Sequence, residues 1–141
     1  KKFLFRFASL LKMRKHKADA EQQKMGELLF NRKRLLEKLE QEEEQIQGLF
    51  NEQSVLRGRQ MRSGYEHLHE KQRSILRLQD EIQKINQEIE AQKEEVIEAN
   101  KQFKMMELLE AKDRLKYMKE QEMEEQFQLN EIATQMFNRS N

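Results

Sequence analysis

The stretch that decides the fold runs from residue 75 to residue 106 and reads ILRLQDEIQKINQEIEAQKEEVIEANKQFKMM. Its apolar residues recur at alternating intervals of three and four, which returns them to one side of a helix every seven residues. Nine of the ten positions of this register are apolar, and Gln92 is the exception. Neither a strand, which alternates every second residue, nor a disordered segment would keep such a register. The stretch is therefore predicted to be one strand of a coiled coil.

The same seven-residue lattice occupies the first part of the chain. Eleven of its sixteen positions between residues 4 and 56 are apolar, whereas hydrophobic residues make up 36% of the sequence. Between the two stretches, residues 57–64 hold two of the four glycines and a serine, the one strong cluster of helix-breaking residues. The pattern predicts a first helix over residues 3–56, a turn over 57–67 and a second helix over 68–138.

Composition narrows the fold class to helices. The 141 residues include no proline and no tryptophan, and strong helix formers such as Glu, Gln, Lys, Arg, Leu and Met dominate. Turn residues are too scarce for a sheet, a sandwich or a doubly wound fold. We therefore expect an all-α protein: one domain over residues 1–141, in which two long helices form an antiparallel coiled-coil hairpin.

A turn centred near residue 62 also predicts which residues face each other. The register pairs Met25 with Ala99, Leu35 with Ile89, Arg32 with Gln92 and Gln53 with Lys71. Polar seam positions then coincide on the two helices, which avoids placing a charge opposite a leucine. Glu21 and Glu42 do not fit, and we expect both to reach water from a narrow seam. A slip of one heptad stays open as an alternative.

The register changes near the end of the chain. After Met106 the apolar positions shift phase and continue as Leu108, Ala111, Leu115, Met118, Leu129, Ile132 and Met136. Such a discontinuity alters the supercoil or turns the apolar side toward another partner. In the predicted register, residues from about 121 onward extend beyond the first helix.

The glycine, histidine and acidic residues of the sequence are not spaced as they are in catalytic or metal-binding motifs. No glycine-rich phosphate loop is present, and His67 and His69 are two residues apart, which places them on different sides of a helix. Runs such as 42–44 supply paired carboxylates, but a two-helix rod has no partly dry pocket to perturb them. We expect no enzyme activity, no cofactor and no metal.

Other functional classes are excluded on simple grounds. Without cysteine there are no disulfides and no thiolates, which suits a reducing compartment. The net charge of +1 gives no drive toward nucleic acid, and no apolar run reaches the roughly 18–20 residues of a membrane span. We expect no secretory signal at the start, because no long apolar region follows its basic residues.

The two ends of the chain are complementary in charge and rich in large apolar residues. Residues 1–17 carry seven Lys or Arg and no acid, whereas residues 120–131 carry five Glu and no base. The apolar residues there are Phe3, Phe5, Phe7, Leu10 and Leu11, and Phe127, Leu129, Ile132, Met136 and Phe137. Three interpretations stay open: local self-packing, insertion into a partner protein, and binding to a membrane surface.

These ends also resemble a known family. Residues 3–14, FLFRFASLLKMR, are similar to the start of the flagellar export protein FliJ, and residues 108–110 (LLE) and 129–135 (LNEIATQ) are similar to its last helix. The similarity covers essentially the whole chain. Near the turn, Tyr65, Leu68, Ile75 and Leu76 fit the family's spacing, whereas Gln72 stands at a position expected to be apolar.

The resemblance implies a central stalk for a type III export ATPase: a monomeric antiparallel coiled coil that enters the ATPase ring and promotes its assembly and activity. It implies further contacts with the cytoplasmic domain of the export gate and with substrate chaperones, in the cytoplasm at the inner face of the cell membrane. The expected ring contacts are Phe3, Phe7, Leu10, Leu11, Arg14, Ile132, Met136 and Phe137. The expected gate and chaperone contacts are Leu68, Ile75 and Leu76.

The residues alone leave an alternative function open. A rod with one apolar, charge-patterned end would serve equally well as a coiled-coil adaptor that tethers other cytoplasmic proteins. Such rods commonly dimerise in parallel, whereas a stalk on the axis of a ring has to be a single chain. Oligomeric state therefore discriminates between these two functions. A third possibility, a helix bound to a lipid surface, would depend on Phe3 and Phe7.

Overall fold

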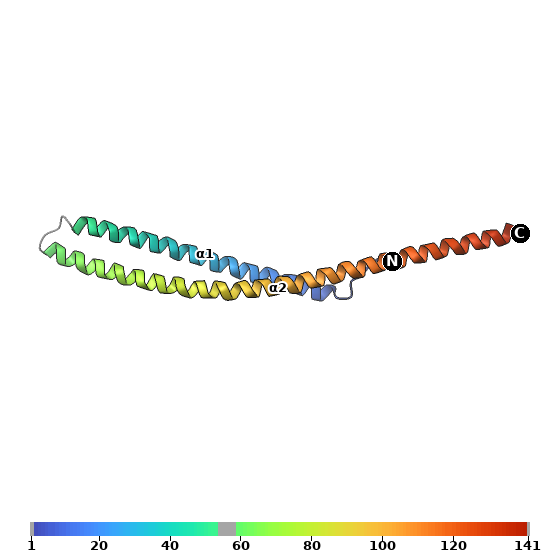
Figure 1. Ribbon diagram of the computed structural model, residues 1–141, viewed down its shortest axis with the longest axis horizontal. Helices are drawn as coiled ribbons and strands as arrows, with labels where there is room; N and C mark the ends of the chain where they lie inside the picture. Colours follow the sequence, from blue (N-terminus) through green and yellow to red (C-terminus); the bar gives the residue numbers. More distant parts are fainter. Residues whose placement is uncertain (1, 54–58, 141) are drawn as a thin grey trace. The chain divides into compact units, whose positions relative to one another are not determined.

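Two long helices make up the protein. The computed structural model describes residues 2–53 and 59–140, in which α1 spans Ala8–Gln53 and α2 spans Arg59–Ser140 (Figure 1). Within these ranges there is no strand, and the two helices pack against each other. The predicted all-α class with two packed helices is confirmed.

The helix boundaries differ from prediction at two places. The first helix begins at Ala8 rather than at residue 3, since residues 2–5 have no regular structure and residues 6–7 form a turn. The backbone N–H of Ala8 donates to Phe5 O at 3.2 Å, which closes that turn. The predicted turn over 57–67 is wrong from Arg59 onward, because α2 already begins there. Strong helix formers surround Gly64, and a single glycine costs a helix only about 1 kcal/mol. Residues 54–58 lie outside the described ranges.

The contacts of the chain form two compact units, which are described separately. The hairpin unit comprises Asp19–Ile97, and the terminal unit comprises Lys1–Ala18 together with Glu98–Asn141. In the hairpin unit the two helices lie side by side and run in opposite directions (Figure 1). Its core consists of Leu68, Leu78, Ile85 and Ile89, and the facing leucines of α1 are half-buried. A two-helix seam leaves such residues partly open because each has only one neighbouring helix.

The predicted register of the hairpin unit is wrong. Gln92, expected opposite Arg32, instead bonds to Glu21, and Lys71, expected opposite Gln53, instead lies 3.0 Å from Glu42. In each case the partner on α1 lies eleven residues closer to its N-terminus than predicted. The helices are therefore slipped by more than the one heptad that was left open as an alternative. Apolar residues follow the lattice along both helices, so several slips keep apolar residues opposite one another and the lattice does not select one register.

Polar groups inside the seam find partners on the opposite helix. The side chain of Glu21 is only 4% exposed, so the expectation that it reaches water is wrong. Gln92 Nε2 donates to Glu21 Oε2 at 2.6 Å and to Glu21 O at 2.9 Å. Half-buried Glu42 forms an ion pair with Lys71, although the two groups do not have hydrogen-bond geometry. These contacts favour one register because a slip would break the interhelical bonds of these buried and half-buried polar groups.

The terminal unit packs residues 2–18 against the part of α2 that follows Ile97. Ala18 and Ala99 are buried, and so is Phe5. The sequence lattice placed Leu4 in the seam, but Leu4 is 86% exposed and Phe5 takes the inward place. The reason is that the lattice assumes a helix, and residues 2–5 are not helical.

Two apolar stripes run along different sides of α2 in the terminal unit. The first, the inner seam, keeps its phase beyond Met106 through positions that are buried or half-buried: Ala99, Phe103, Met106, Glu110, Asp113 and Tyr117. The second, the outer stripe, begins at Leu108 and is exposed. The apolar residues therefore shift phase after Met106 as predicted, whereas the covered positions keep the earlier phase and become polar, as at Glu110 and Asp113.

Candidate functional site

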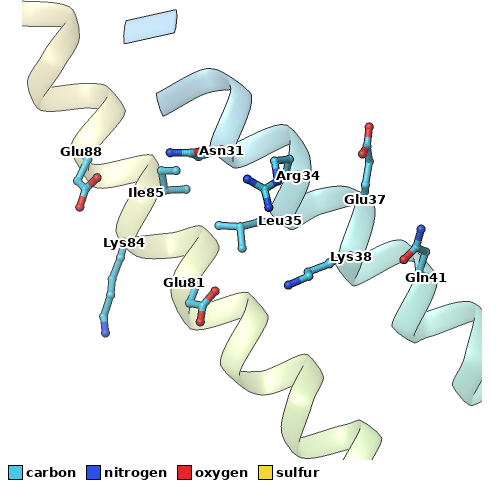
Figure 2. Close-up of a pocket in the computed structure, with 10 residues that line it drawn as sticks. All are labelled: Asn31, Arg34, Leu35, Glu37, Lys38, Gln41, Glu81, Lys84, Ile85 and Glu88. Atoms are coloured by element: carbon cyan, nitrogen blue, oxygen red, sulfur yellow. The ribbon is translucent and has the colours of Figure 1, made fainter. Parts of the chain in front are cut away.

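An open groove lies between α1 and α2 in the hairpin unit. Figure 2 shows Leu35 and Ile85 facing the space between the helices, with charged and amide side chains around them. The groove has acids and bases on both helices: Arg34, Glu37 and Lys38 on α1, and Glu81, Lys84 and Glu88 on α2. No histidine lines it, and its carboxylates stand on an open surface that water screens. This arrangement is that of a solvated coiled-coil flank.

In residues 2–53 and 59–140, no group of three or more His, Asp or Glu side chains is placed to hold a metal ion. Within the same residues, neither helix contains a stretch long and apolar enough to cross a membrane.

The predicted ring contacts near the N-terminus are largely engaged within the chain. Phe3, Phe7, Leu10, Leu11 and Arg14 are all half-buried. The ring of Phe3 lies 5.5 Å from that of Tyr117, and the guanidinium of Arg114 lies 4.7 Å from the Phe3 ring centre. The rings of Phe7 and Phe5 meet edge to face at 5.9 Å. Such pairs add roughly 0.5–1.5 kcal/mol beyond simple burial, so self-packing describes these aromatic residues best.

The predicted ring contacts near the C-terminus are open. Ile132, Met136 and Phe137 are each more than half exposed. Every residue from 122 to 140 is exposed, so this stretch of α2 has no covering element among the described residues. The structure therefore divides the predicted contact set into a self-packed N-terminal part and a free C-terminal part.

The predicted gate and chaperone contacts also separate into two kinds. Leu68 is buried and Ile75 is half-buried in the seam, so neither presents much surface. Leu76 is 64% exposed and lies in a shallow groove of α2 that is also lined by basic residues. The basic residues are Lys71, Arg73 and Arg77, and Glu70 and His67 also line the groove. Of the three predicted residues, Leu76 alone projects substantially into solvent.

Two residues that pack against the N-terminal segment were not predicted from the sequence. Tyr117 and Arg114 hold the side chain of Phe3, yet neither was predicted to take part. A signal for Tyr117 was available, since extending the lattice from Phe103 by two heptads reaches it. Arg114 has no comparable signal, because it sits outside the lattice and contacts a non-helical segment.

The fold and its surfaces define a class: a helical coiled-coil scaffold whose free apolar surface is on the C-terminal stretch of α2. Within this class, the family model described as "Flagellar FliJ protein" matches residues 3–141. The chain belongs to the FliJ family. It is accordingly a component related to flagellar protein export. No curated protein and no solved structure matches the chain.

Proposed function

We propose that this chain is the stalk of the flagellar export ATPase, entering the ATPase ring and promoting its assembly and activity. The observation that carries the proposal is the exposed C-terminal stretch of α2, which presents Ile132, Met136 and Phe137 without an internal partner among the described residues. A helix that is apolar on its open side buries that surface on binding, at roughly 25 cal/mol per Å². The self-packed aromatic residues near Phe3 hold the N-terminal segment on α2 at Arg114 and Tyr117, just before this exposed stretch begins.

The proposal includes a second contact with the export gate and with substrate chaperones. Leu76 with Arg73 and Arg77 offers an apolar spot among basic residues, which suits an acidic partner surface. We further propose that the chain acts as a monomer in the cytoplasm, peripheral at the inner face of the cell membrane, where an export ATPase would hold it. Leu68 and Ile75 would support this contact from the seam rather than touch the partner.

The test is stimulation of ATP hydrolysis by the export ATPase of the same organism. We expect the full chain to stimulate hydrolysis and to co-purify with the ATPase. A variant carrying Ile132→Asp, Met136→Asp and Phe137→Asp should lose both effects. A matched control carrying Leu29→Asp, Leu36→Asp and Phe50→Asp, on an exposed side of α1, should keep them. Loss of binding with the control alone would reverse the assignment of the contact surface.

The adaptor alternative is tested by oligomeric state. Light scattering of the purified chain should give the mass of one chain, about 17.2 kDa. A stable homodimer that does not affect ATP hydrolysis would favour an adaptor rod over a stalk.

A further inference from the structure

The outer stripe of α2 follows the heptad spacing of a coiled-coil seam, but no helix of the described residues covers it. Its positions follow intervals of three and four: Leu108, Ala111, Leu115, Met118, Glu122, Glu125, Leu129, Ile132 and Met136. All nine positions are exposed, and seven of them are apolar. The inner seam shows the opposite trend, because beyond Tyr117 its positions are mostly polar, as at Glu120, Glu124 and Glu131. The apolar surface of this stretch is therefore on the outer side.

The outer stripe also joins a hollow in the terminal unit. A groove of about 530 Å³ has an apolar floor that includes Leu11 of α1 and Ala111, Leu115 and Met118 of α2. Charged side chains of both signs also line it: Lys12, Lys15, Glu107, Glu110 and Arg114. A helix laid along the stripe would have one of its ends in this groove. Knobs at three- and four-residue spacing with a groove beside them match the way an amphipathic helix binds.

The acidic residues in the middle of the outer stripe determine which kind of partner helix can bind there. Glu122 and Glu125 occupy one heptad in the middle of the stripe, and residues 120–131 contain five Glu and no base. The nearest basic side chain on the stretch is Lys119, one turn before Glu122. A partner seam with aliphatic residues opposite these two glutamates would bury their charge without a partner, which is strongly unfavourable.

A second copy of the chain fits poorly for the same reason. The stripe is symmetric about its centre, so two antiparallel copies would match Met118 with Leu129 and Leu115 with Ile132. The same alignment places Glu122 of each copy against Glu125 of the other, so that four carboxylates meet at the centre. Like charges at a seam disfavour self-pairing.

We propose that the outer stripe binds one amphipathic helix of another protein, whose seam carries two basic residues between aliphatic heptads. The basic pair lies against Glu122 and Glu125, and the aliphatic residues cover Leu115 and Leu129 on either side. Ile132 and Met136 belong both to this stripe and to the proposed ring contact. The identity of the partner therefore rests on the proposed function, whereas its chemistry does not.

The test uses synthetic peptides, so that it does not depend on the ATPase. Two four-heptad helical peptides have identical aliphatic seams and differ only at two central seam positions, which are Lys in one and Glu in the other. Fluorescence anisotropy measures the binding of each peptide to the full chain. We expect the Lys peptide to bind at least tenfold more tightly than the Glu peptide, with an affinity that falls as salt rises.

Variants of the chain separate charge from apolar contact. The double variant Glu122→Lys with Glu125→Lys should reverse the preference and favour the Glu peptide. Leu115→Asp with Leu129→Asp should abolish binding of both. Met123→Asp, at a site that is exposed but outside the stripe, should leave binding unchanged. Equal binding of the two peptides, or binding of neither, would overturn the proposal.

Light scattering tests the competing occupant. We expect the natural chain to be monomeric, and Glu122→Gln with Glu125→Gln to promote dimers that Leu129→Asp breaks. If the natural chain already dimerises and Leu129→Asp breaks that dimer, the occupant is a second copy and the proposal fails. Selective binding of the Lys peptide without stimulation of the ATPase would support this inference and count against the stalk function. Stimulation of the ATPase without selective peptide binding would support the stalk function and overturn this inference.

Discussion

Ile89 and Ile132 lie on the same helix, yet Ile89 is 1% exposed and Ile132 is 53% exposed. Ile89 belongs to the hairpin unit, where α1 runs beside it, and Ile132 belongs to the stretch 122–140, in which every residue is exposed. Both stand in seven-residue lattices of similar quality. The comparison teaches that a heptad lattice specifies a helix that can pair, whereas burial depends on whether a second helix is present.

The polar residues of the two regions sharpen this contrast. In the hairpin unit, the buried carboxylate of Glu21 is met by Gln92. In the outer stripe, Glu122 and Glu125 stand open in the middle of an apolar run. In the hairpin unit the chain itself supplies the group that pairs with the buried carboxylate. On the outer stripe no described helix does so, and the proposed partner helix would supply the basic residues that pair with Glu122 and Glu125.

The largest expected effect is the difference in stability between variants in which Ile89 or Ile132 is replaced by alanine. Ile89→Ala should lower the free energy of unfolding by about 2–4 kcal/mol, because it removes buried methyl groups and leaves a cavity. Ile132→Ala should change it by less than about 0.5 kcal/mol. Chemical denaturation followed by circular dichroism measures both. Equal losses in the two variants would mean that residue 132 is buried in solution and would remove the contrast.

The second effect concerns the buried polar pair. Gln92→Leu should cost about 1–3 kcal/mol, because Glu21 loses its two hydrogen bonds from Gln92 while it stays buried. Adding Glu21→Leu should recover most of the loss, since an apolar pair of similar size fills the seam. The same denaturation experiment measures the coupling. If the double variant is no more stable than Gln92→Leu, the two residues do not act as a pair.

The third effect tests the non-helical start. Phe5→Ala should expose the segment 2–7 and raise its rate of amide hydrogen exchange, at a local cost of about 1–2 kcal/mol. Leu4→Ala, at its 86% exposed neighbour, should leave exchange unchanged. Mass spectrometry of exchanged peptides distinguishes the two. A larger effect at Leu4 would restore the lattice position that the sequence predicted for it.

The smallest effect is a gain in stability. Gly26 and Gly48 lie inside α1, and a Cβ added at either would meet no described atom within 4 Å beyond the local backbone of its own helix. Gly26→Ala and Gly48→Ala should each stabilise the helix by up to about 1 kcal/mol. Thermal unfolding measures the gain. A loss at either position would show that another molecule, or a second copy, approaches the helix there.

Prediction from sequence succeeded where local periodicity carries the information. The lattice through Ile75, Leu78, Ile82 and Ile85 identified α2 because one-sided burial of a long helix requires that spacing. It failed at Leu4 and Phe5, where the chain is not helical and spacing loses its meaning. It also failed in the register, because every heptad slip preserves an apolar lattice and only the polar contacts distinguish one slip from another.

The candidate surface was predictable in part. Ile132, Met136 and Phe137 were expected to be free beyond the end of the first helix, and they are exposed. Phe3 and Phe7 were assigned to the same surface, but their packing with Tyr117 and Phe5 depends on the path of a short non-helical segment. No periodic signal describes that path.

By itself, the sequence determined that this protein is made of two long helices, that one apolar lattice runs along each of them, and that an acidic heptad interrupts a second stripe near the end. These properties are local, since they follow from helix propensity and from spacing along one helix. Only the tertiary structure decided which lattice positions are covered, how far the helices are slipped, and that Glu21 is buried against Gln92. These depend on contacts between residues far apart in the chain, and many registers offer nearly equal apolar burial before polar pairing selects one.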